Sequence, residues 1–142
     1  MRLWHTELIS ALPREQLVAQ WRELSAIAGA IQKSGTPNHI LVNFVLDYDF
    51  DDFISYAHKI RQEMTRRGYR TMNSVWDKIV SLKPNYQLKE DIYTNKMDIE
   101  YLVICYYNLK EKYLCGGITE TDWNNINTTY HKQVYNNAFQ SK

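Results

Sequence analysis

The sequence predicts an all-α protein that folds as one domain over residues 1–142. Apolar residues recur at three- and four-residue steps in several stretches, and the five Gly and three Pro are few. The length of 142 residues, with 44% hydrophobic and 23% charged residues, is typical of one globular domain. We expect three main helices, several short helices and an N-terminal arm packed between helices.

The first helix is predicted over residues 14–32, and Pro13 suits its start. Its apolar stripe faces the core and consists of Leu17, Trp21, Leu24, Ala28 and Ile31. Arg22 and Glu23 lie on the other side, among small side chains. These small side chains permit either helix packing or the close approach of a ligand to the backbone.

A second helix is predicted over residues 50–67, after a loop and an apolar, partly alternating stretch at residues 40–48. Acidic residues occupy its first turn, Arg66 and Arg67 its last turn, and Gly68 the terminating position, as the helix dipole favours. Four carboxylates cluster around its start: Asp47, Asp49, Asp51 and Asp52. We interpret this cluster as helix-start chemistry and not as a metal site.

Three further helices are predicted along the second half of the chain. A short helix begins at Asn73 or Ser74 and ends near residue 81. The third main helix covers residues 98–112, and because it is apolar on more than one side we expect it to be buried. A last helix begins at residue 119 or 121 and ends near residue 135. Cys105 and Cys115 lack metal-binding spacing, so we expect reduced, structural thiols.

Charge and motifs exclude several classes of function. The formal net charge is +1, so DNA binding would require local segregation of charge, which the first half provides outside its acidic cluster. No apolar run is long enough to span a membrane, and the start lacks the pattern of a signal peptide. We expect a soluble, intracellular, cytoplasmic protein without a membrane partner. The common phosphate, metal and serine-nucleophile motifs are absent, and we expect no metal and no cofactor.

The first 70 residues, about half of the chain, resemble the pyrimidine-dimer DNA glycosylase and abasic-site lyase family, small all-α enzymes of the ultraviolet-damage endonuclease V type. The matching residues are Leu8-Ile9-Ser10, Leu12, Leu17, Ala19, Trp21-Arg22-Glu23-Leu24, Gly29, Arg61-Gln62-Glu63 and Arg67-Gly68-Tyr69. The opening Met1-Arg2-Leu3-Trp4-His5, with Leu12-Pro13-Arg14 and Arg66-Arg67-Gly68-Tyr69, is similar to a less-characterised branch of that family.

The resemblance implies an imine mechanism in which the N-terminal α-amine attacks the sugar of a damaged nucleotide. Reference pKa values are ~7.7–8.0 for an α-amine and ~10.4 for lysine, so more of the α-amine is neutral near pH 7. By the same resemblance, Glu23 is the acid/base and electrostatic partner, and Arg22 contacts a phosphate beside it. The family's terminal threonine is replaced by Met1, which Arg2 should protect from removal.

Duplex DNA is the expected partner, and we expect the protein to act on it as a monomer. The candidate DNA-binding residues are Arg2, His5, Arg14, Gln16, Arg22, Lys33, Arg66, Arg67 and Arg70. Ala26 stands where the family carries another basic residue. The alternative is a non-catalytic helical module that binds DNA or protein and has kept only the fold.

Several of these residues have a structural interpretation as well. His5 either orients Glu23 or a phosphate, or is structural, and the basic group at residues 66–70 is either a DNA contact or helix C-terminal charge. Three tryptophans, Trp4, Trp76 and Trp123, either stack on bases or pack in the core, and core packing is the better interpretation. Trp21 belongs to the core stripe of the first helix.

Overall fold

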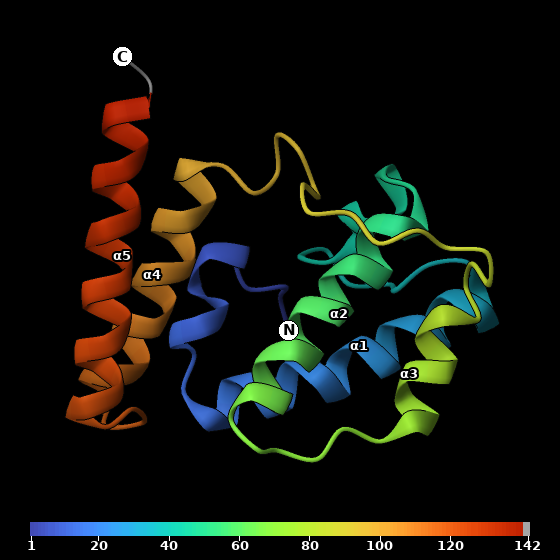
Figure 1. Cartoon of the computed structure of the whole chain (residues 1–142), viewed down its shortest axis with the longest axis horizontal. Coiled ribbons are helices and arrows are strands. Elements are labelled where there is room, and N and C mark those ends of the chain that lie inside the picture. The colour runs from blue at the N-terminus through green and yellow to red at the C-terminus, as the bar shows by residue number, and fades with distance from the viewer. Residues whose placement is uncertain (141–142) are drawn as a thin grey trace. The chain divides into compact units, whose positions relative to one another are not determined.

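The computed structural model describes residues 1–140 (Figure 1). All regular structure in this part of the chain is helical, which confirms the all-α prediction. The α-helices are α1 (Arg14–Ser34), α2 (Phe50–Arg66), α3 (Asn73–Val80), α4 (Ile99–Leu114) and α5 (Glu120–Gln140). Two short 3-10 helices complete the elements, η1 (Thr6–Ala11) and η2 (Asn43–Asp47).

Internal contacts group the chain into two compact units. The first consists of Met1–Leu3 and Glu15–Tyr93, and it holds α2, α3, η2 and all but the first residue of α1. The second consists of Trp4–Arg14 and the chain from Thr94 onward, and it holds η1, α4 and α5. The expectation of a single domain over residues 1–142 stays a prediction.

In the first unit, α1 buries the apolar stripe expected from the sequence. All five members of that stripe are buried: Leu17, Trp21, Leu24, Ala28 and Ile31. Two glutamines, Gln16 and Gln20, are buried in the same helix, with exposed fractions of 6% and 0%. Because a buried amide must find hydrogen-bond partners, these two side chains mark a polar part of an otherwise apolar face.

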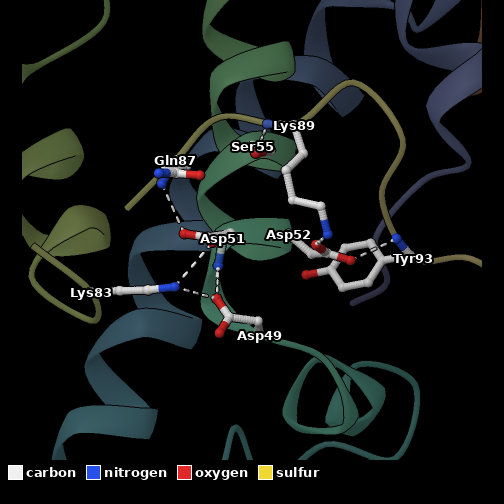
Figure 2. A network of polar contacts seen from close by, with 8 residues as sticks. All are labelled: Asp49, Asp51, Asp52, Ser55, Lys83, Gln87, Lys89 and Tyr93. Atoms are coloured by element: carbon white, nitrogen blue, oxygen red, sulfur yellow. Dashed lines mark hydrogen bonds and ion pairs between the residues drawn. The ribbon is translucent and has the colours of Figure 1, made fainter. Parts of the chain in front are cut away.

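The acidic cluster at the start of α2 caps the helix and holds the chain that follows α3 (Figure 2). Asp49 is the N-cap and accepts a hydrogen bond from the Asp51 amide at 2.8 Å. The ammonium of Lys83 lies 2.9 Å from Asp49 and 3.0 Å from Asp51. Hydrogen bonds from Asp51 lower the pKa of Asp49, and Lys83 adds to this effect. The helix-start interpretation is therefore confirmed for Asp49, Asp51 and Asp52, whereas Asp47 belongs to η2.

Asp52 anchors the same segment from the buried side of α2. Its carboxylate accepts a hydrogen bond from the Tyr93 amide at 2.9 Å and lies 2.6 Å from the ammonium of Lys89 (Figure 2). The Lys89 amide also donates to the Ser55 hydroxyl at 2.8 Å. In the part of the chain that the structure describes, no group of three or more His, Cys, Asp or Glu residues could hold a metal ion.

The end of α2 follows the sequence prediction to within one residue. Gly68 has a φ of +79°, a left-handed conformation that glycine adopts without steric cost. This conformation lets the Tyr69 amide donate to the Met64 carbonyl at 2.8 Å and the Gly68 amide donate to the Thr65 carbonyl at 3.0 Å. These two bonds satisfy carbonyl groups that the helix leaves open at its end.

In the second unit, aromatic side chains join α4 to α5, which lie side by side in Figure 1. The rings of Tyr106 and Tyr130 stack with centroids 3.7 Å apart, and Tyr113 stacks on Trp123 at 5.0 Å. The expectation that the third main helix is buried holds for one side of the helix only. Its outer side leaves four large apolar side chains exposed, because α5 covers only one side: Ile99, Ile104, Tyr107 and Leu114.

The opening residues are more regular than the sequence indicated, because residues 6–11 form η1, which contacts α5. Both cysteines are free thiols, and Cys105 is buried whereas Cys115 is exposed. Among the described residues, none of the helices combines the length and the apolar character that a membrane crossing requires.

Candidate active site

The first residues of the chain lie in the first unit and are fixed to α1 by a side chain of that helix. Leu3 is fully buried, whereas Met1 is 46% exposed. The carbonyl oxygen of Arg2 accepts a hydrogen bond from Nε2 of Gln20 at 3.0 Å. The main chain next to the N-terminal amine therefore has a defined position on α1.

Gln20 connects this N-terminal segment to the candidate catalytic carboxylate. Its Nε2 also donates to Oε2 of Glu23 at 3.3 Å, and its Oε1 accepts a hydrogen bond from the Tyr56 hydroxyl at 2.8 Å. The orientation of the amide is determined by its partners, because the Arg2 carbonyl and an ionised Glu23 can only accept. Gln20 and Tyr56 are both fully buried, so the hydrogen bond between them forms out of contact with water.

Glu23 and the first residues of the chain thus both contact the side-chain amide of Gln20. Glu23 is partly exposed, and Arg22 beside it is exposed. A carboxylate in such a position can stabilise a cationic intermediate and transfer protons. The structure thus brings together Arg2 and Glu23, which the sequence proposed separately.

Gln20 was not identified from the sequence. The signal that could have found it is its position in α1, one residue before Trp21 and between Leu17 and Leu24 of the buried stripe. A glutamine at such a position must be buried together with a partner. Tyr56 could not be predicted as that partner, because the contact depends on how α2 packs on α1.

The other basic candidates of the first unit lie at the surface. Arg22, Lys33 and Arg70 are exposed, and Arg2 is partly exposed. Gln16 differs from them, because it is buried and its Oε1 has no hydrogen-bond partner in the described part of the chain. Arg14 is exposed and belongs to the second unit.

Arg66 and Arg67 share one acidic partner, Glu63, one turn earlier in α2. Nε of Arg66 lies 3.0 Å from Oε1 of Glu63, and Nε of Arg67 lies 2.7 Å from Oε2. Burial by itself would raise the pKa of Glu63, but hydrogen bonds from the two arginines outweigh it and lower that pKa. The Arg66 side chain is 65% exposed and that of Arg67 only 16%, so Arg66 is the more accessible of the two.

His5 lies in the second unit and caps η1. Its Nδ1 accepts a hydrogen bond from the Glu7 amide at 3.1 Å, which leaves Nε2 as the protonated nitrogen, 3.1 Å from the Asp98 carbonyl oxygen. Burial lowers the pKa of His5, despite the nearby Glu7 carboxylate. These contacts describe a neutral histidine that holds η1 and the start of α4 together.

The tryptophans divide between the core and the surface. Trp21 and Trp123 are buried in their respective units, which confirms the core interpretation for both. Trp76 is partly exposed and lies 5.3 Å from the guanidinium carbon of Arg61. Trp4 is also partly exposed and lines a hollow next to α4 in the second unit.

Comparison with known families decides what this site belongs to. The model of one family, described as pyrimidine dimer DNA glycosylase, matches residues 1–77, more than half of the 142 residues. The chain belongs to the pyrimidine dimer DNA glycosylase family. The match covers Met1, all of α1 with Gln20 and Glu23, and all of α2 with Tyr56.

Membership of the pyrimidine dimer DNA glycosylase family makes the protein a DNA-acting enzyme at the level of the family. The resemblance found in the sequence is confirmed, and it extends to residue 77. Residues 78–142, with α4 and α5, lie outside the match. No curated protein and no solved structure matches the chain.

Proposed function

We propose that the protein is a DNA glycosylase with abasic-site lyase activity, which acts on damaged or modified bases in duplex DNA, pyrimidine dimers among them. The α-amine of Met1 is the nucleophile and Glu23 is its acid/base and electrostatic partner. The observation that carries this proposal is the Gln20 amide, whose hydrogen bonds to the Arg2 carbonyl and to Glu23 tie the start of the chain to that carboxylate. Family membership supports it independently.

In the proposed reaction, the amine nitrogen forms a bond to C1′ of the damaged nucleotide. The bond between C1′ and the base breaks, and the base leaves with the bonding electron pair and takes up a proton. Opening of the C1′–O4′ bond, with protonation of O4′ and loss of the amine proton, gives an imine between Met1 and C1′. Removal of a C2′ proton then breaks the C3′–O3′ bond and expels the 3′ phosphate, and water hydrolyses the imine.

Glu23 has two tasks in this sequence. As a carboxylate it stabilises the positive charge that develops on the sugar and on the iminium nitrogen. As a proton carrier it transfers protons during ring opening and elimination. Phosphates of the duplex are neutralised by Arg22, Lys33 and Arg70, which are exposed, and by Arg2, which is partly exposed. Damaged bases are reached by extruding a nucleotide from the helix, which the family's chemistry requires.

The experiment is borohydride trapping of untagged protein on duplex oligonucleotides that carry an abasic site or a cyclobutane dimer. Mass spectrometry first verifies an unmodified Met1 and then locates the cross-link. We expect an adduct on Met1 that disappears when the amine is acetylated. Glu23→Gln should reduce the yield by about 100-fold or more and leave DNA binding nearly unchanged.

Glu15→Gln is the matched control, since it removes an exposed carboxylate from the first turn of the same helix. We expect this variant to form the adduct at the wild-type rate. A wild-type protein with a free Met1 amine that binds both duplexes but forms no adduct would overturn the imine mechanism. That result would favour a DNA-binding module that has kept the fold without the chemistry.

A further inference from the structure

We propose that the exposed face of α2 carries a second anion site, in which His58, Arg61 and Arg66 bind a phosphate group. This site goes beyond the imine chemistry and does not depend on it. Five residues of α2 line an open hollow of about 510 Å³ in the first unit: His58, Arg61, Gln62, Thr65 and Arg66. Their spacing of three and four residues places all five on one side of the helix over two turns.

Arg61 is held in place by neutral partners. Its Nε donates to the Thr71 hydroxyl at 3.1 Å, and its Nη2 donates to Oδ1 of Asn73 at 2.8 Å. The guanidinium also lies over the ring of Trp76 at 5.3 Å. These contacts orient the group, and among residues 1–140 no carboxylate forms an ion pair with it and Nη1 has no hydrogen-bond partner. A fixed guanidinium with unneutralised charge is suited to bind phosphate oxygens.

His58 lies one turn before Arg61 in α2, and the positive charge of Arg61 acts on its imidazole. Burial lowers its pKa, and the positive charges of Lys59 and Arg61 lower it further, while Glu90 opposes them weakly. Glu90 is itself 3.7 Å from the ammonium of Lys59, and the ring of Trp76 lies 6.3 Å from that of His58. The imidazole therefore lies in a positive potential that an anion in the hollow would relieve.

Arg66 and two uncharged side chains complete the hollow. Arg66 is fixed by Glu63 through Nε and Nη2, which leaves Nη1 of its largely exposed guanidinium for a ligand. Gln62 and Thr65 are exposed and offer an amide and a hydroxyl as donors. Planar guanidinium groups, an imidazole and small neutral donors are the set that recognises the oxygens of a phosphate. A DNA phosphodiester and free inorganic phosphate share this chemistry, and they are the two possible sources.

The test follows the His58 ring by NMR from pH 5 to 8 in the full-length protein. Three samples are compared: protein alone, protein with inorganic phosphate, and protein with an undamaged duplex oligonucleotide. A bound anion favours the imidazolium, so the titration midpoint of His58 should rise. A rise with the duplex identifies a DNA phosphate, and a rise with inorganic phosphate alone identifies a free phosphate site.

Two variants make the test specific. Arg61→Gln removes the central charge, and Thr65→Glu puts a negative charge into the hollow without touching the contacts of Arg61. Both should abolish the rise of the midpoint. If the duplex is the ligand, both variants should also make the plot of log association constant for the duplex against log salt concentration less steep by about 0.9, the value for one lost phosphate contact. Lys132→Gln on α5, which removes an exposed charge elsewhere, is the control and should leave both readouts unchanged.

The proposal is overturned if neither phosphate nor duplex moves the His58 midpoint, or if the rise persists in both variants. Because the readout is binding at His58, it is independent of imine formation at Met1. A protein that fails the trapping experiment can therefore still show this site, and a protein that forms the adduct can still lack it.

Discussion

The hydroxyl of Tyr56 donates a hydrogen bond of 2.8 Å to Oε1 of Gln20, and this bond joins α2 to α1 out of contact with water. The same amide donates to the Arg2 carbonyl and to Glu23 on its other side. A phenol in the middle of α2 thereby determines the orientation of a group that spans the start of the chain and the candidate catalytic carboxylate. The positions of the first residues and of the Glu23 carboxylate are therefore coupled through the Gln20 side chain.

The Tyr56→Phe substitution tests this coupling. We expect the free energy of unfolding to fall by about 1–2 kcal/mol, because the buried Gln20 oxygen loses its phenol donor. The rate of imine formation on abasic DNA should fall several-fold while the affinity for that DNA stays the same. Single-turnover trapping and a binding titration measure the two quantities. Tyr107→Phe, which alters an exposed tyrosine of α4, should change neither.

Replacement of Gln20 by methionine should have a larger effect on imine formation than Tyr56→Phe, because it removes both bonds of the amide nitrogen. A role in positioning predicts a lower kcat with an unchanged KM. It also predicts that the amides of residues 2 and 3 exchange faster with solvent, which hydrogen exchange measures without any catalysis. If Gln20→Met lowers the free energy of unfolding but leaves kcat unchanged, the role of Gln20 is purely structural.

His5 predicts a dependence of stability on pH. Burial lowers the pKa of His5 in the folded protein, so between that value and the ordinary value of 6.5 the unfolded chain binds more protons. Stability should therefore fall as the pH is lowered below about 6.5 and level off below the folded pKa. Urea unfolding at pH 5, 6 and 7 measures this. The decrease should be smaller in His5→Gln, and an unchanged decrease would contradict the assignment. The pKa of His58 is also lowered, so this residue too makes stability fall at low pH. The variant His58→Gln measures its part of the decrease.

Glu63 predicts a change of stability with pH in the same direction as His5, but at lower pH. The pKa of Glu63 is lowered in the folded state. Its contribution to the free energy of unfolding is therefore present above about pH 4.5 and is lost as the pH falls through the pKa of the folded protein. Glu63→Gln should reduce the free energy of unfolding at pH 7 by about 1–3 kcal/mol, because two arginines lose a largely buried charged acceptor. Asp77→Asn, an exposed change on α3, is the control for the loss of one negative charge. Equal stability of the two variants at pH 7 would refute the role of Glu63.

Asp52 predicts a stability effect in the same unit. Its side chain is 5% exposed and accepts from the Tyr93 amide and from Lys89, so Asp52→Asn should reduce the free energy of unfolding by about 2 kcal/mol. Lys89→Met should have a smaller effect, because the lysine is 47% exposed and its ammonium remains close to water. Asp47→Asn alters an exposed carboxylate of the same cluster and should be neutral. Urea unfolding gives all three values, and the reverse order would show that Asp52 is not the anchor.

The helices of the first unit could be predicted because their signals are local. The stripe of Leu17, Trp21 and Leu24 determines the face of α1, and Asp49 and Gly68 determine the two ends of α2 to within one residue. The exposed side of α4 could not be predicted, because the helix is apolar on more than one side and only the packing of α5 shows which side is covered. The η1 helix was missed for a different reason, since its cap is a histidine and not one of the usual capping residues.

The candidate site was predictable only where a family resemblance named the residue. Glu23 and Arg22 were found in this way, whereas Gln20 and Tyr56 act through a contact between residues 36 positions apart. Such contacts arise when helices pack, and spacing along one helix carries no information about them. Gln16 is buried, and its contact with DNA stays a prediction.

The three carboxylates at the start of α2 have a consequence for the limits of the folded core. The family match ends at residue 77, but Asp49, Asp51 and Asp52 find their cations at Lys83 and Lys89. A fragment cut at the end of the match would leave three like charges crowded at one helix end, where only the helix dipole would offset their repulsion. The end of the family match at residue 77 is therefore not the end of the stable folded unit, which requires the chain as far as Tyr93.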